Sequence, residues 1–356
     1  MPGERRADDE SDLIRTDYSN LESVSWWKSH GLDGLVLYAW GAPRYRKIAR
    51  AARDAGVFLV LNQDNGGLVS PLAGPMSWLA EQRNLGGCEQ GAGGWLRFFG
   101  LVARGMTVGL ALIDPLRAQH LKFGNVIACV SPRAAEYYRR LCRIYGGGRL
   151  AGRVMVLPHG VATGFKWTGR TKKRQIVCVG RWEDTAQKRP GLLSAVVGKL
   201  LESDEGVTVI IAGKLDQSLD SWYAKLEGGI RDRVKVLGRV GRNELSGLMD
   251  ESEVFYSPSA FESFGIAAAE ALCCGCSVVA ARSVSMASFA WFTGESSGQL
   301  AQLDDAEGHV AALTAELGEW ANGRRDAARI SAIWCERLHA DKLAARIAEL
   351  VCCGDL

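Results

Sequence analysis

The strongest constraint on the fold is the alternation of short apolar runs with helical segments between residues 176 and 281. The apolar runs have the length and the β-branched character of buried strands. The predicted strands are 176–179, 207–212, 234–237, 254–256 and 277–280, separated by helices at 189–202, 219–228, 242–249 and 264–274. Strands and helices that alternate at this spacing predict a parallel, doubly wound α/β sheet.

A less regular version of this pattern precedes that unit. Strands are predicted at 35–38, 57–61, 126–130 and 154–157, with helices at 44–55 and 132–145. A length of 356 residues suits two domains. We therefore expect an N-terminal α/β domain over residues 1–165, a C-terminal α/β domain over residues 170–330 and a closing helix over residues 331–356.

Composition narrows the class of protein. The near balance of charge, +3 overall, gives no support for nucleic-acid binding. The N-terminus lacks the apolar segment of a secretory signal, so we expect the ten cysteines to be free thiols of a cytoplasmic protein. Cys273 and Cys276 form a C-x-x-C pattern, which could indicate a metal or redox site. Because no second C-x-x-C or nearby histidine accompanies it, we expect apolar packing at a helix end instead.

One segment, Trp95 to Ile113, is apolar enough to suggest a membrane span. Arg97 and Arg104 lie inside it, and arginines are costly near the centre of a bilayer. We therefore expect a buried or surface-facing helix. Peripheral contact with the inner face of a membrane stays open as the alternative.

Two cationic residues follow the first strand of the C-terminal unit. Arg181 comes directly after that strand, and Lys188 precedes the next helix. Ligands of doubly wound sheets bind at the carboxyl ends of the strands, and two cations there suit a diphosphate. The chain has no P-loop motif, and a solvated basic loop is the alternative interpretation.

A second candidate segment runs from the end of strand 254–256 into the next helix, and it contains Glu262, Ser263, Phe264, Gly265, Ile266 and Glu270. Gly265 would let a ligand approach the backbone, and the helix N-terminus offers free N–H groups to a phosphate. Glu262 could accept hydrogen bonds from sugar hydroxyls, and Glu270 from a ribose. Ser259 and Glu262 also have the spacing of a capping box, so a purely structural role for Glu262 stays open.

These motifs together resemble the group 1 (family 4) retaining glycosyltransferases, which have the GT-B fold. The resemblance rests on Gly180-Arg181 with Lys188, on the E-x₇-E spacing of Glu262 and Glu270, and on the Pro158-His159-Gly160 turn. It implies two Rossmann-like domains facing a cleft. It also implies a metal-independent hexosyltransferase that takes a UDP-, GDP- or ADP-sugar and needs no further cofactor. The acceptor would be a glycan, a lipid-linked molecule or a small molecule.

The resemblance also implies roles for individual residues. Arg181 and Lys188 would hold the donor diphosphate, and the backbone of residues 263–266 would meet phosphate and sugar. Glu262 would contact the donor sugar and Glu270 the ribose. Where the family often has a histidine, this chain has Asp64, which would orient donor or acceptor unless it only forms an Asx turn. His159 is expected to be structural.

The chain departs from the family at its N-terminal side. The first apolar strand begins near Leu35, so the N-terminal domain is expected to be abbreviated. This departure leaves open a catalytically inactive sugar-nucleotide-binding or partner protein, and also an epimerase. The arginine-rich helix from Arg44 to Arg53 suggests an anionic or membrane-bound acceptor, with a solvated helix face as the alternative.

Overall fold

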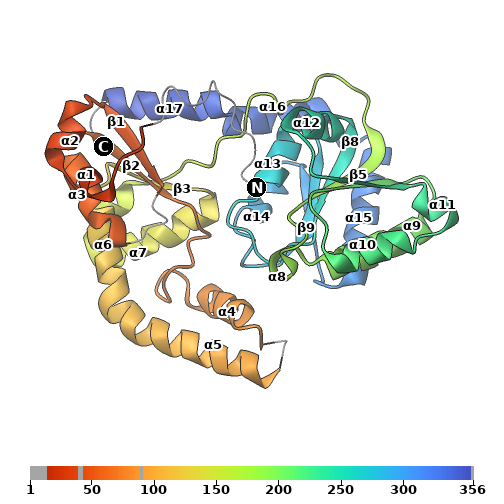
Figure 1. The fold of residues 1–356 in the computed structure, drawn as a ribbon, viewed down its shortest axis with the longest axis horizontal. Helices are drawn as coiled ribbons and strands as arrows, with labels where there is room; N and C mark the ends of the chain where they lie inside the picture. Colours follow the sequence, from red (N-terminus) through yellow and green to blue (C-terminus); the bar gives the residue numbers. More distant parts are fainter. Residues whose placement is uncertain (1–13, 39–42, 89–90, 354–356) are drawn as a thin grey trace.

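The computed structural model describes residues 14–38, 43–88 and 91–353, which form two α/β domains with one parallel sheet each (Figure 1). The first sheet has the strand order β1-β2-β3-β4. Its strands are β1 (Gly34–Tyr38), β2 (Phe58–Gln63), β3 (Val126–Cys129) and β4 (Val154–Val156). The helices of this domain are α1 (Tyr18–Leu21), α2 (Val24–Ser29), η2 (Pro43–Tyr45), α3 (Arg46–Asp54), α4 (Pro75–Gly86), α5 (Ala92–Arg104), η4 (Gly105–Ile113), α6 (Asp114–Leu121) and α7 (Pro132–Gly152).

The second sheet has six strands in the order β10-β9-β8-β5-β6-β7. They are β5 (Lys173–Val179), β6 (Thr208–Ala212), β7 (Val234–Gly238), β8 (Ser252–Ser257), β9 (Ser277–Ala281) and β10 (Gly298–Ala301). The helices are α8 (Thr185–Lys188), α9 (Pro190–Ser203), α10 (Gln217–Ala224), α11 (Gly228–Arg231), α12 (Arg242–Glu251), α13 (Ile266–Cys273), α14 (Phe289–Phe292), α15 (Ala306–Ala321), α16 (Ala327–Leu338) and α17 (Ala340–Cys353). The order reverses at β5 and β8, which is where such sheets bind ligands.

The strands coincide with the apolar runs of the sequence, with two informative differences. β5 begins at Lys173, three residues before the predicted start, since its polar first residues pair at the sheet's end. β10 was not predicted, because Leu300 is its one large apolar side chain. Apolar periodicity therefore finds central strands more readily than edge strands.

The last two helices tie the domains together. α16 packs against α13 of the second domain, and α17 then crosses to the first domain (Figure 1). At the crossing, the backbone of Val161 exchanges hydrogen bonds of 2.8 and 2.9 Å with Leu338 and Ala340. Trp334 of α16 is fully buried and packs edge-to-face on Trp291 and Phe292. The aromatic cluster thus fixes the helix that leads back to the first domain.

A long helical segment projects from the first domain. α5, η4 and α6 follow one another without a break from Ala92 to Leu121, and α4 packs beside α5 (Figure 1). Glycines allow this close packing: a Cβ at Gly105 would lie 2.4 Å from the Trp78 ring, and a Cβ at Gly86 would lie 2.9 Å from Phe98. We call α4, α5 and η4, residues 75–113, the helical arm.

The close approach of Gly213 to Gly180 yields a prediction about stability. Gly213 has a φ of 116°, and a Cβ there would lie 1.8 Å from the Gly180 carbonyl oxygen. Gly213→Ala should therefore lower the free energy of unfolding by about 1–3 kcal/mol, measured by chemical denaturation. Gly229→Ala is the matched control, because nothing lies within 4 Å of a Cβ at that helical position. Equal stability of the two variants would contradict this account of the turn.

Candidate donor-binding site

A cavity of about 530 Å³ lies at the carboxyl ends of β5 and β8, with the N-terminus of α13 in its wall. The first domain contributes Asp64, which follows β2, and His159, which follows β4. The second domain contributes the other residues that line the cavity: Val179, Gly180, Arg181, Lys188, Phe255, Ser257, Glu262, Ser263, Phe264, Gly265, Ile266, Ala267, Ala268 and Phe289. Eight of the nine residues predicted for the site from the sequence line this cavity, and Glu270 is the exception.

The centre of the wall is an ion pair between Lys188 and Glu262. Lys188 Nζ donates to Glu262 Oε1, and both side chains are about 85% buried. Ser259 Oγ also donates to that carboxylate oxygen, at 3.3 Å. Asp184 caps the short helix α8 that ends at Lys188, by accepting from the Gln187 N–H at 3.2 Å. The pair therefore joins the loop after β5 to the loop after β8, with a cation and an anion at the cavity surface.

Arg181 has a different environment from Lys188. Its side chain is 75% exposed, and its closest acidic neighbour is Asp184, with 4.0 Å between Nη2 and Oδ2. A contact so long and so exposed contributes little energy. The guanidinium is therefore free to turn toward an anion in the cavity without breaking a buried interaction.

The N-terminus of α13 supplies the other feature suited to an anion. Gly265 precedes the helix with a φ of 81°, and a Cβ there would lie 2.6 Å from the Phe289 ring. The positive φ and the nearby Phe289 ring therefore both require glycine at this position, whether or not a ligand binds. Ile266, Ala267 and Ala268 line the cavity, and the first N–H groups of a helix have no partner within it. Together with the helix dipole they favour a phosphate.

The capping-box interpretation of Glu262 is wrong. The helix begins six residues later than that spacing requires, with Gly265 as its N-cap instead of Ser259. Ser259 Oγ bonds to the Glu262 carboxylate, and Glu262 pairs with Lys188. The position of Glu262 is fixed by its own backbone, since its N–H donates to the Ser285 carbonyl at 2.9 Å. Glu262 therefore presents a carboxylate to the cavity.

Glu270 lies one turn further along α13, on the same helix face as Ala267. Burial raises the pKa of its carboxyl group to about 7, and the nearby Arg242 guanidinium offsets part of that effect. A carboxyl group with this pKa gains its charge in the physiological range, and only the ionised form accepts hydrogen bonds at both oxygens.

Asp64 and His159 form a second polar side-chain contact in the cavity. His159 Nε2 lies 2.7 Å from Asp64 Oδ1. The imidazole also stacks on Tyr38 and meets the edge of Phe264. The Asp64 side chain therefore has a partner beyond the proposed Asx turn. His159 lines the cavity in addition to its place in the interdomain turn. The sequence feature that could have identified His159 as a site residue is its position three residues after β4, on the ligand side of the sheet.

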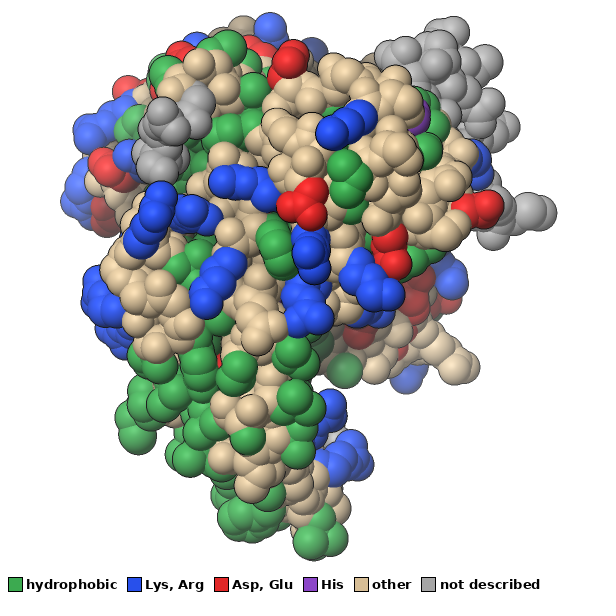
Figure 2. Space-filling model, turned by 90° about the vertical axis from the view of Figure 1, so that its left-hand side faces the viewer, with side chains coloured by type: hydrophobic (Ala, Val, Ile, Leu, Met, Phe, Trp, Pro, Cys, Tyr) green, Lys and Arg blue, Asp and Glu red, His purple; other side chains and the backbone are tan. Residues whose placement is uncertain are grey.

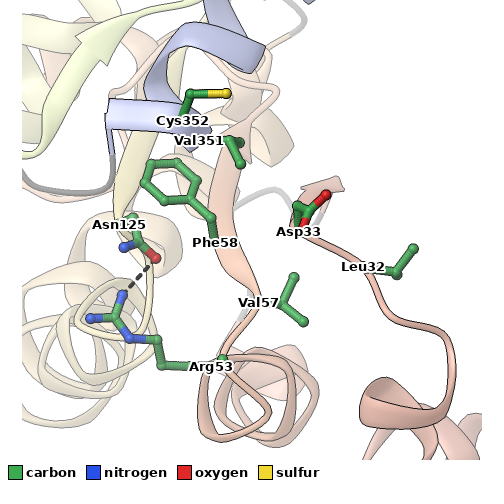
Figure 3. A pocket seen from close by; sticks show the side chains of 9 residues that line it. Leu32, Asp33, Arg53, Val57, Phe58, Asn125, Val351 and Cys352 are labelled. Carbon is green, nitrogen blue, oxygen red and sulfur yellow. Dashed lines mark hydrogen bonds between the residues drawn. The ribbon is translucent and has the colours of Figure 1, made fainter.

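Two other features lie away from this cavity. A cavity of about 570 Å³ opens at the amino-terminal ends of β1 and β2, where Arg53 donates to Asn125 at 2.6 Å (Figure 3). The amino-terminal edge is not where such sheets bind substrates. Among the described residues, Cys273, Cys335 and His339 could offer three ligand atoms to a metal. None of them lines the donor-side cavity.

This architecture of two parallel-sheet domains with a site between them is that of the GT-B glycosyltransferases. The structure of Anabaena HepE in complex with UDP matches with a TM-score of 0.59 at 17% identity, over 93% of this chain and 82% of that one. Sucrose-phosphate synthase from Thermosynechococcus elongatus matches with a TM-score of 0.54 at 14% identity, over 95% and 80%. These similarities confirm the predicted fold class.

Sequence comparison relates the second domain to one family. Residues 173–317 match the family described as glycosyl transferases group 1. A GDP-mannose:cellobiosyl-diphosphopolyprenol alpha-mannosyltransferase of Komagataeibacter xylinus is 31% identical over 181 residues, 49% of this chain and 42% of that protein. The gpi3 subunit of a Schizosaccharomyces pombe phosphatidylinositol N-acetylglucosaminyltransferase is 30% identical over 91 residues. The second domain is therefore similar to the group 1 glycosyltransferases, as its motifs predicted, and the chain's matches span less than half of these curated relatives.

The pKa of Glu270 gives a prediction for ligand binding. If the carboxylate accepts from ribose hydroxyls, the affinity for a nucleotide sugar should rise as pH increases through about 7, because ligand favours the ionised form. Between about pH 6 and 8 the gain should approach tenfold. Isothermal titration calorimetry measures it, with a nucleotide sugar whose diphosphate does not titrate in this range. Glu270→Gln should bind weakly and lose the slope, whereas an equal slope in both proteins would exclude the role.

Proposed function

We propose that this protein transfers a sugar from a nucleoside-diphosphate-sugar donor to an acceptor hydroxyl, with retention of the anomeric configuration. The observation that carries the proposal is one cavity containing the Lys188–Glu262 pair, Arg181 and the N-terminus of α13. Cations and helix N–H groups suit the diphosphate, and the carboxylate of Glu262 suits sugar hydroxyls. The match of residues 173–317 to the group 1 glycosyltransferases supports the same reaction class.

The reaction needs a stable leaving group, and the site supplies positive charge for it. The bond between the anomeric carbon and the diphosphate oxygen breaks, and the diphosphate leaves as an anion. Arg181, Lys188 and the first N–H groups of α13 would stabilise that charge without a metal ion. The acceptor oxygen bonds to the anomeric carbon on the face that the diphosphate leaves, and its proton passes to the departing phosphate oxygen. This step needs no protein base.

Asp64 and His159 line the opposite wall, on the side of the first domain. We propose that Asp64 holds the imidazole in a fixed orientation toward the reacting sugar, where it would position donor or acceptor hydroxyls. Their 2.7 Å contact supports this role, because it removes the freedom of both side chains.

A hexose is the proposed transferred group, and UDP-, GDP- or ADP-sugars are the proposed donors. The mannosyltransferase relative uses GDP-mannose and a cellobiosyl-diphosphopolyprenol by its name, which favours GDP and a lipid-linked acceptor over a soluble glycan. We also propose a cytoplasmic location on the inner face of a membrane, in keeping with ten cysteines that are all free thiols.

The test begins with thermal shifts of the purified chain with UDP, GDP, ADP and their common sugars. The nucleotide that raises the melting temperature identifies the donor class. Release of that nucleoside diphosphate from its sugar is then followed for the wild type and Arg181→Ala. If charge stabilisation dominates, the variant should be about 10²–10³-fold slower in kcat. Arg239→Ala, on the exposed turn after β7, is the control. Binding without any turnover would favour an inactive sugar-nucleotide-binding protein, and equal rates would exclude the role of Arg181.

A further inference from the structure

We propose that the helical arm is a membrane-docking element that seats this protein on the surface of an anionic lipid bilayer. The arm is α4, α5 and η4, inserted between β2 and β3. The docking surface goes beyond the proposed reaction. Its consequence for the acceptor rests on that reaction and is stated separately below.

The first observation is the exposure of apolar side chains along the arm. The continuous helix Ala92–Leu121 has a mean hydropathy of 1.6 over its most apolar window, yet only 11% of that window is buried. Ten of the nineteen exposed large hydrophobic side chains among the described residues fall between residues 72 and 112. Leu96 and Phe99 are 75% and 60% exposed. A concentration of this kind marks an interaction surface, since scattered single residues are the normal case.

The packing within the arm determines which of its faces stays uncovered. α4 covers one side of α5 and η4, through Trp78 against Gly105 and Phe98 against Gly86. The opposite side has no cover in the described structure, and Figure 2 shows its hydrophobic side chains gathered over the projecting end of the molecule. The arm therefore presents a continuous apolar face away from both domains.

The second observation is the sign of the charge beside that face. Residues 14–165 carry 18 Lys and Arg against 9 Asp and Glu, whereas the whole chain has a net charge of only +3. Residues 92–113 contain Arg97 and Arg104 and no acidic residue. Figure 2 shows Lys and Arg side chains in a band next to the apolar region. An apolar face bordered by basic side chains is complementary to the headgroups and acyl boundary of an anionic membrane.

The same charges decide between docking on a membrane and the other two arrangements of an apolar helix. Arg97 and Arg104 are exposed within the segment, so the helix would place two arginines in hydrocarbon if it crossed the bilayer. At the surface they reach the headgroups, with Trp95 and Phe99 in the interfacial layer where aromatic side chains are favoured. A second copy of the chain would bring two basic borders together, which is repulsive. An anionic bilayer is the occupant that fits.

The arm also reaches the donor site. Asn84 of α4 donates to Ser285 Oγ at 2.9 Å, and Ser285 Oγ donates to the Glu81 carboxylate. The Ser285 carbonyl in turn accepts from the Glu262 N–H. A cavity of about 310 Å³ lies between these residues, lined by both Glu81 and Glu262. If the proposed transfer is correct, an acceptor anchored in the bilayer meets the donor sugar at this cavity, beside the arm.

The test is flotation with vesicles of equimolar phosphatidylcholine and phosphatidylglycerol, compared with phosphatidylcholine alone. We expect the intact protein to float with the anionic vesicles and largely to dissociate in high salt. Leu96→Ser combined with Phe99→Ser should abolish flotation. Leu237→Ser combined with Leu303→Ser, two exposed apolar residues of the other domain, should leave it unchanged.

A charge variant separates electrostatic attraction from burial of the apolar face. Arg97→Glu with Arg104→Glu should lower partitioning by more than about fivefold for each arginine removed. Arg329→Glu, on the exposed face of α16, should have little effect. Thermal shifts with the donor nucleotide, measured on the same samples, should be equal in all variants. If the wild type shows no thermal shift with any nucleotide, the donor site is refuted, and the docking result is unaffected.

Two results would overturn the docking proposal. Wild-type protein that stays with the soluble fraction in the presence of anionic vesicles would contradict it directly. A concentration-dependent dimer in sedimentation, lost in the Leu96→Ser and Phe99→Ser variant, would show that a second copy covers the arm.

Discussion

The arrangement of the site depends on the ion pair between Lys188 and Glu262. These residues are 74 positions apart in sequence, on loops that follow two adjacent parallel strands, β5 and β8. In a largely buried ion pair, removal of one partner leaves the other as an uncompensated charge. The pair therefore holds both loops at the carboxyl edge of the sheet, and the N-terminus of α13 follows only four residues after Glu262.

The ion pair is already formed before a donor binds. In the free protein the lysine charge is already balanced by a carboxylate, so the diphosphate adds a second anion beside the cation. The exposed Arg181 guanidinium and the helix N–H groups are the groups available to balance that second charge. This division of roles explains why a single cavity needs two cations with such different burial.

The sequence was sufficient for the class of fold, because central parallel strands are apolar on both faces and appear as short continuous runs. The runs at 176–179 and 254–256 also located the ligand edge, and the residues after them are the ones that meet in the cavity. The edge strand β10 was missed, since a strand with one large apolar side chain gives no clear period. The helix α4 was missed because its segment is rich in Gly and Pro.

Other features depend on contacts that no local pattern encodes. His159 gains its place in the cavity from Asp64, 95 residues away in sequence. The capping-box spacing of Ser259 and Glu262 was misleading, because the helix starts later, at a glycine whose left-handed backbone the spacing does not reveal. Hydropathy predicted an apolar helix over 95–113, but a buried helix and an exposed arm have the same composition. Only the packing of α4 on one side of α5 separates the two.

The central claim is that a nucleoside diphosphate binds between the Lys188 loop and the N-terminus of α13. Hydrogen–deuterium exchange with and without the donor nucleotide tests it most directly, because the first N–H groups of α13 lack helical partners and exchange quickly in the free protein. We predict slower exchange in peptides covering 261–269 and 180–189, with no change in peptides from 92–113. Protection elsewhere, with these two segments unchanged at saturating nucleotide, would contradict the account.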